Sequence, residues 1–103
     1  MTKIIGKLLK RGKVSIYTIP ETIDEAFQVL DLCLTKEDKE WMKEEKNSAI
    51  KVHHTLGRWM RNQWKFWEGN TKLTNYLTSQ GFIHPDDMSN EILEKYVEYL
   101  KNK

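Results

Sequence analysis

The sequence predicts an all-α fold, a compact bundle of about five helices around a central tryptophan-rich helix. Between residues 20 and 103, apolar side chains recur at helical spacing in successive stretches, most of which begin with a residue that caps helices. The stretch 48–68 holds three of the four tryptophans, and its apolar arc covers more than half of a helical wheel. A chain of 103 residues has room for one core, so residues 20–103 are predicted to form a single helical domain.

Residues 1–19 are predicted to be a basic N-terminal arm or a short β-hairpin. They contain five basic residues and no acid. Val14–Ile19 is a β-branched and aromatic run, and Arg11-Gly12 would turn the chain back from Ile4–Leu9. The apolar residues of Ile4–Leu9 also have helical spacing, so an amphipathic helix over residues 2–10 is the alternative. A basic arm for an anionic partner is one interpretation, and a solvated edge is the more common one.

Two helices are predicted after Pro20. Thr22 and Glu25 have the spacing of a capping box, which predicts a helix that runs to about Leu34. Thr35 begins the next helix, with acids in the first turn near the positive end of the helix dipole.

The central helix is predicted to span residues 48–68. Asn47 or Ser48 would cap it, and Gly69 would end it in the left-handed conformation. The wheel places Trp64 and Met60 in the core.

Two further helices are predicted in the C-terminal part. Thr71 begins a short helix that Gly81 stops, and Phe82–Met88 is expected to be a loop. Ser89 is predicted to cap the last helix, whose apolar residues form one stripe.

The composition excludes several classes of protein. A single cysteine, Cys33, rules out an internal disulfide, and no apolar run approaches the length of a membrane span. The N-terminus lacks the apolar core of a secretion signal, so we expect a cytoplasmic protein. The net charge of +2 and the mixed charges of residues 21–46 weigh against a nucleic-acid partner. Without a phosphate-binding loop or a C-x-x-C pair, no cofactor is expected.

The polar side of the central helix offers a first candidate site. Arginine forks beside indoles suit a phosphate or carboxylate attached to a planar ring. The candidate residues are His54, Arg58, Arg61, Asn62 and Trp64. A structural role is the more common use, in which Arg61 pairs with Asp86 or Asp87. Adjacent histidines on a helix point about 100° apart, which argues against one metal site shared by His53 and His54.

The segment around Pro85 offers a second candidate. His84, Asp86 and Asp87 lie together, and with a histidine of the central helix they would form a catalytic acid pair or a metal site. Two acids just before a helix also have a common structural role, in which they interact favourably with the positive end of the helix dipole.

Two motifs carry a family resemblance. H-x-x-G-R-W-M-R-N-x-W-x-x-W at His54–Trp67, followed by H-P-D-D-M-S at His84–Ser89, resembles a small bacterial domain family of unknown function. The resemblance runs from Pro20 to about Leu100. Gln63 and Lys65 depart from the R-N-N-W-G-L-W pattern of the family. The family has no assigned activity, so the resemblance implies domain limits and no chemistry.

We therefore expect a small non-enzymatic binding protein of bacterial or phage origin. Its partner would be a protein, as in an immunity-type antagonist, or a small anionic ligand such as a nucleotide. The alternative is a small metal- or acid/base-dependent enzyme that uses the His84-Pro85-Asp86-Asp87 loop. The sequence is compatible with an oligomer, and no membrane partner is expected.

Overall fold

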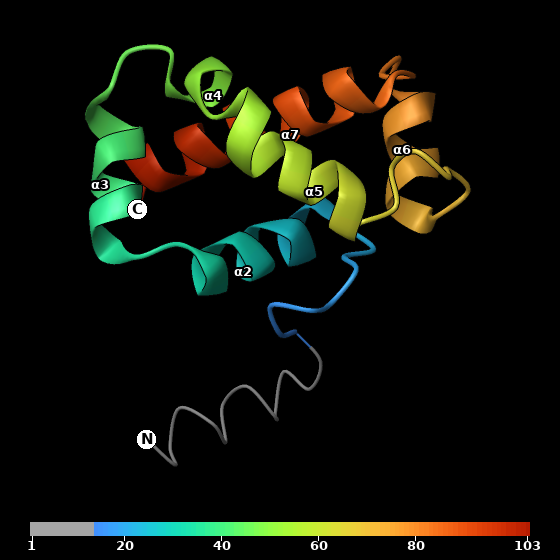
Figure 1. Cartoon of the computed structure of the whole chain (residues 1–103), viewed down its shortest axis with the longest axis horizontal. Coiled ribbons are helices and arrows are strands. Elements are labelled where there is room, and N and C mark those ends of the chain that lie inside the picture. The colour runs from blue at the N-terminus through green and yellow to red at the C-terminus, as the bar shows by residue number, and fades with distance from the viewer. Residues whose placement is uncertain (1–13) are drawn as a thin grey trace.

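A computed structural model describes residues 14–103, and every regular element in this part of the chain is helical (Figure 1). The predicted all-α class is confirmed for these residues. The elements are α2 (Ile23–Cys33), α3 (Lys36–Glu44), α4 (Ser48–Lys51), the π-helical turn η1 (His53–Gly57), α5 (Arg58–Gln63), α6 (Lys72–Ser79) and α7 (Pro85–Lys101).

The longest helix, α7, is the element on which most of the others pack. It contacts α2, α3, α4, η1 and α5, and α3 and α6 lie at opposite ends of the molecule (Figure 1). Ile92, Leu93 and Tyr96 lie on one stripe of α7 and are fully buried. The predicted central position of the 48–68 stretch is therefore shared with α7.

The predicted capping residues begin three of the helices. The Thr22 hydroxyl accepts the Glu25 N–H at 3.1 Å at the start of α2. Thr35 and Thr71 each form a reciprocal capping box at the start of α3 and α6. Asn47 precedes α4 in the left-handed conformation (φ 59°) and makes no side-chain cap.

The prediction of one continuous helix over residues 48–68 is wrong. The chain is α-helical only to Lys51, then makes a π-helical turn in which the Gly57 N–H bonds the Val52 carbonyl at 3.0 Å. This wider turn holds an additional residue, so the side chains before it rotate relative to those after it. Ile50, which one continuous helix would place on the apolar side, is 60% exposed.

The C-terminal end of this stretch also differs from the prediction. Helix α5 ends at Gln63, and Lys65 rather than Gly69 is the first residue with a positive φ, 59°. Trp64 and Met60 are buried as predicted. Residues 64–68 form turns, and Trp67 points outward because it no longer follows the helical wheel.

The start of α7 is a second correction. The segment Phe82–Met88 is not all loop, and Ser89 is not the cap, because α7 already begins at Pro85 with His84 as its N-cap. Proline fits the first helical position, where its missing N–H is not needed. Ser89 lies inside the helix and is fully buried.

The predicted β-hairpin is not supported. Its first half lies outside the described residues, and Val14–Ile19, the predicted second strand, forms a turn. The Thr18 N–H bonds the Ser15 carbonyl at 3.1 Å, and the Ser15 N–H bonds the Thr18 hydroxyl at 2.8 Å. Serine and threonine side chains compete with strand pairing through such local bonds.

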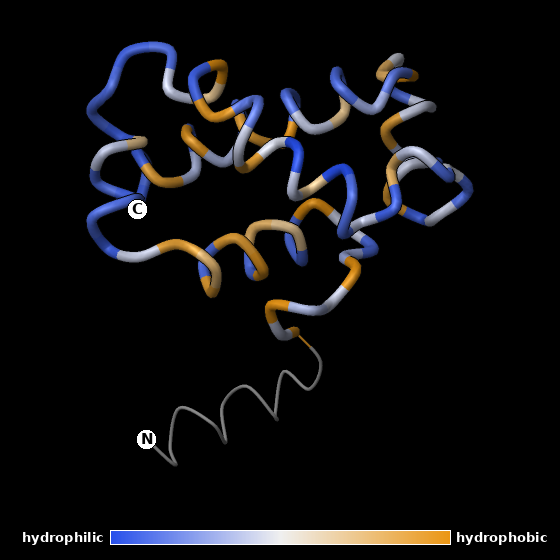
Figure 2. The backbone as a smooth tube through the Cα atoms, in the orientation of Figure 1, coloured by the Kyte–Doolittle hydropathy of each residue, from blue (hydrophilic) through white to orange (hydrophobic). Residues whose placement is uncertain are grey.

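The core is a continuous cluster of apolar side chains from six helices. It includes Val29 and Leu30 of α2, Met42 of α3, Ala49 of α4, Met60 of α5, Leu73 and Leu77 of α6, and Ile92 and Leu93 of α7. Figure 2 shows that α2 is rich in hydrophobic residues, and its Ala26, Val29 and Leu30 are completely buried. Within residues 14–103, none of the helices has both the length and the apolar character that crossing a bilayer requires.

Candidate functional site

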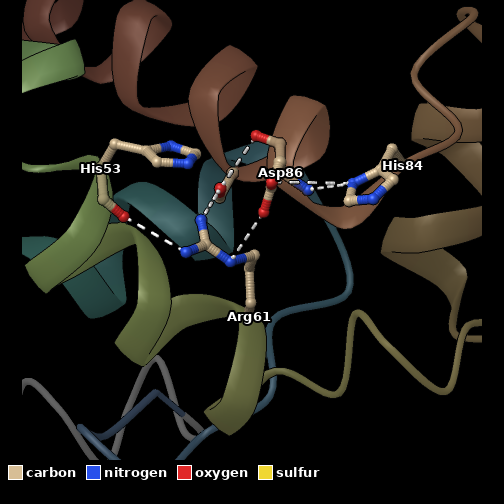
Figure 3. Close-up of polar contacts among 5 residues, drawn as sticks. His53, Arg61, His84 and Asp86 are labelled. Atoms are coloured by element: carbon tan, nitrogen blue, oxygen red, sulfur yellow. Dashed lines mark hydrogen bonds and ion pairs between the residues drawn. The ribbon is translucent and has the colours of Figure 1, made fainter.

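The guanidinium group of Arg61 is the point at which the two sequence motifs meet (Figure 3). Only 6% of the residue is exposed. Nη1 donates to Ser89 Oγ at 2.7 Å, Nη2 donates to the His53 carbonyl at 3.3 Å, and Nε lies 3.3 Å from Asp86 Oδ1. The predicted pairing of Arg61 with an acid near Pro85 is present. We define His53, Arg61, Asp86 and Ser89 as the Arg61 cluster.

Three elements position this cluster. Helix α5 carries Arg61, the π-helical turn supplies the carbonyl of His53, and the beginning of α7 supplies Asp86 and Ser89. Gly57 leaves the space that the guanidinium fills, because a Cβ atom there would lie 3.0 Å from Nη1. The absence of a side chain at this position therefore allows α5 and α7 to approach.

The contacts of the cluster compensate the burial of a positive charge. An unpaired guanidinium that is nearly excluded from water would be strongly destabilising. Here each of its three nitrogens has an oxygen partner. Ser89 Oγ, which accepts a hydrogen bond from Arg61, also donates one to the Asp86 carbonyl at 3.1 Å. Asp86 itself is about half exposed, so its attraction to Arg61 is partly screened.

His84 has a structural role at the start of α7 and an exposed ring. Its Nδ1 accepts the Asp86 N–H at 3.0 Å, which satisfies one of the free amides of the first turn. The His84 ring also packs against Trp67 in a T-shaped arrangement, with the ring centroids 5.5 Å apart. His84 and Trp67 are both solvent-exposed, so this pair forms part of the surface next to the cluster.

The remaining predicted site residues do not join this network. Trp64 lies in the core, whereas His54, Arg58, Asn62 and Asp87 are exposed. Within residues 14–103, no ion pair or hydrogen bond connects the side chains of these four to the Arg61 cluster. In the same part of the chain, no three His, Cys, Asp or Glu side chains gather closely enough to hold a metal ion.

The indole of Trp64 has an unusual environment. Among the described residues, its Nε1–H is the one buried side-chain donor without a hydrogen-bond acceptor. The rings of Trp59 and Phe66 lie about edge-on to it, with centroids 5.9 and 6.0 Å away. Such tilted arrangements let the positive edge of one ring meet the negative face of another.

The sequence did not predict a second polar cluster, around Asp31. The Tyr96 hydroxyl donates to Oδ1 at 2.7 Å and the Tyr99 hydroxyl to Oδ2 at 3.2 Å, while Lys39 and Lys103 lie within 4.0 Å. Burial, together with the bond to this carboxylate, raises the pKa of Tyr96 well above its ordinary value. The aspartate joins α2 to the far end of α7, and nothing in its own neighbourhood of the sequence indicates that partnership.

The match to a family model covers residues 19–100 and therefore all the described helices up to the last turn of α7. The chain belongs to a family described as a domain of unknown function, DUF6794. The limits agree with those that the sequence motifs implied, and the whole Arg61 cluster lies inside them. Comparisons with curated proteins and with solved structures give no match.

Proposed function

We infer that this DUF6794 domain is a non-enzymatic binding protein whose partner is another protein. The observation that carries the proposal is a group of exposed side chains beside the Arg61 cluster. Trp67 is 59% exposed, Ile83 is 71% exposed, and the ring of His84 lies against Trp67. We define Trp67, Ile83 and His84 as the Trp67 patch.

The backbone on both sides of the Trp67 patch is held in place. On one side, the N–H groups of Glu68 and Gly69 both bond the Lys65 carbonyl, at 3.1 and 3.2 Å. On the other side, His84 caps α7, and the same first turn is tied to α5 through Asp86 and Arg61. An exposed tryptophan on a fixed backbone loses little entropy on binding and is typical of the residues that dominate binding energy.

The state of Arg61 favours a protein over a small anionic ligand. All three guanidinium nitrogens already have partners within the fold, so this side chain would have to break contacts to hold a phosphate. Trp64, the indole expected beside such a ligand, is buried. The exposed patch needs no such rearrangement, and a partner of the antagonist or immunity type would cover it directly.

The test is affinity capture with the tagged full chain from cells of its natural host, followed by mass spectrometry. Trp67→Ala and Ile83→Ser should lose a protein that the wild type captures, because each removes a large part of the apolar contact. Trp41→Ala is the matched control, since Trp41 is 42% exposed on α3 at the other end of the molecule. Equal capture by all variants would contradict the proposal.

A thermal-shift screen with nucleotides separates the small-ligand alternative. A nucleotide present at 100 times its dissociation constant would raise the free energy of unfolding by about 2.7 kcal/mol. We expect no such rise with the wild-type protein. A clear rise that Arg58→Lys abolishes would move the binding site to the exposed polar side of α5.

A further inference from the structure

A shallow apolar groove runs along the outer side of α2. It consists of two adjoining hollows of about 350 and 300 Å³ that share Leu32 as a lining residue. Phe27 lines the first, and Trp59 and Tyr17 line the second. Leu32 is 40% exposed and Tyr17 is 78% exposed, so apolar surface remains uncovered among the described residues. We define these two hollows as the α2 groove.

The charge of the α2 groove has one sign. Asp24 and Asp31 line it, and none of the described lining residues is a lysine or an arginine. Helix α2 as a whole has three acidic residues and no basic one. Asp24 is exposed and has no ion pair within residues 14–103, whereas Asp31 already has its tyrosine and lysine partners. A partner with apolar side chains and positive charge would complement this groove.

The chain itself contains a segment with that chemistry. Residues 1–13 hold five of the 17 basic residues and none of the 15 acidic ones, which leaves twelve basic and fifteen acidic residues, a net charge of −3, for residues 14–103. Ile4, Ile5, Leu8 and Leu9 are spaced so that helical geometry would place them on one side. The chain thus divides into an apolar, cationic segment and an anionic body.

We propose that residues 1–13 occupy the α2 groove of their own chain. Val14, the first described residue, lines the groove, so the segment starts at the wall of the site. Gly12 just before it allows the chain to reverse at low steric cost. Such a short tether gives the segment an effective concentration on the order of millimolar, which a second copy in dilute solution does not reach. The apolar side chains would cover Phe27 and Leu32, and a lysine would pair with Asp24.

The single cysteine provides the test, because Cys33 lines the α2 groove. The full chain is treated with a short reagent that links a thiol to an amine, and the linked peptides are identified by mass spectrometry. We expect links from Cys33 to Lys7 or Lys10, measured relative to the Cys33–Lys36 link. An equal mixture of unlabelled and ¹⁵N-labelled chains shows whether each link lies within one chain.

Matched variants distinguish specific binding of the segment in the α2 groove from random encounters, because a tethered segment that does not bind would also meet Cys33 by diffusion. Leu8→Asp should lower the yield of links to the segment by roughly tenfold, because it removes an apolar side chain that the proposed docking would bury. Gly6→Asp changes the charge equally but removes no apolar side chain, so it should lower the yield far less. High salt should also lower the wild-type yield, because it screens the pairing with Asp24.

Three results would overturn the proposal. Equal link yields from wild type, Leu8→Asp and Gly6→Asp would mean that the segment comes near Cys33 without binding in the α2 groove. Links mainly between labelled and unlabelled chains would assign the α2 groove to a second copy. Absence of links to the segment, together with sedimentation of the protein on phosphatidylserine vesicles, would assign residues 1–13 to a membrane surface.

Discussion

Replacing Arg61 by lysine should destabilise the fold strongly although the charge is kept. The three guanidinium nitrogens reach Ser89, His53 and Asp86 in different directions. A lysine ammonium is a single nitrogen on a flexible stem, so we expect it to keep about one of these contacts. Losing two contacts of a charged donor, discounted because Asp86 is half exposed, amounts to about 2–3 kcal/mol.

Urea unfolding followed by tryptophan fluorescence measures this loss directly. In a domain of this size, about 2–3 kcal/mol lowers Tm by roughly 10–20 °C, so thermal unfolding gives a second reading. Arg58→Lys is the matched control, because Arg58 is on the same helix and exposed. We expect it to change stability by less than about 0.5 kcal/mol.

The result that would refute the reasoning is an equal, small effect of the two substitutions. A double-mutant cycle of Arg61→Lys with Asp86→Asn then identifies the partner that matters. We expect a coupling energy of about 0.5–1 kcal/mol for this pair, since one of the two groups is solvated. A zero coupling with a large single effect would assign the stability to Ser89 and the His53 carbonyl instead.

Three further predictions concern stability. Trp64→Ala should cost about 3–5 kcal/mol in urea unfolding because the ring is fully buried, whereas the exposed Trp41→Ala should cost far less. Gly57→Ala should destabilise the protein despite the better helix propensity of alanine, because its Cβ would press on Arg61 Nη1 at 3.0 Å; a rise in Tm would contradict the close approach. The contribution of the Tyr96 hydroxyl to stability should not change with pH below about pH 10 and should decrease above it, because the raised pKa keeps Tyr96 neutral in the fold while the same group ionises in the unfolded chain. Stability curves that Tyr96→Phe leaves equally steep above pH 10 would assign the alkaline loss to other groups.

The sequence was sufficient to predict the features that depend on residues close together along the chain. The caps at Thr22, Thr35 and Thr71 require a hydroxyl and an amide three residues apart, so each is readable within one turn. The burial of Trp64 and Met60 followed from helical periodicity. The cost of an unpaired buried charge predicted that Arg61 pairs with Asp86 or Asp87, and the structure selects Asp86.

Only the tertiary structure decided the features that arise where distant segments meet. The π-helical turn places Gly57 against Arg61 and residues of α7, and no local pattern encodes that approach. Helix α5 ends at Gln63 and leaves Trp67 exposed, which creates the proposed binding patch. Asp31 joins Tyr96 across most of the chain for a similar reason. The hydrogen bonds within a helix depend on residues three or four positions apart. The packing of a side chain between two helices depends on the residues of both helices, which are distant in the sequence.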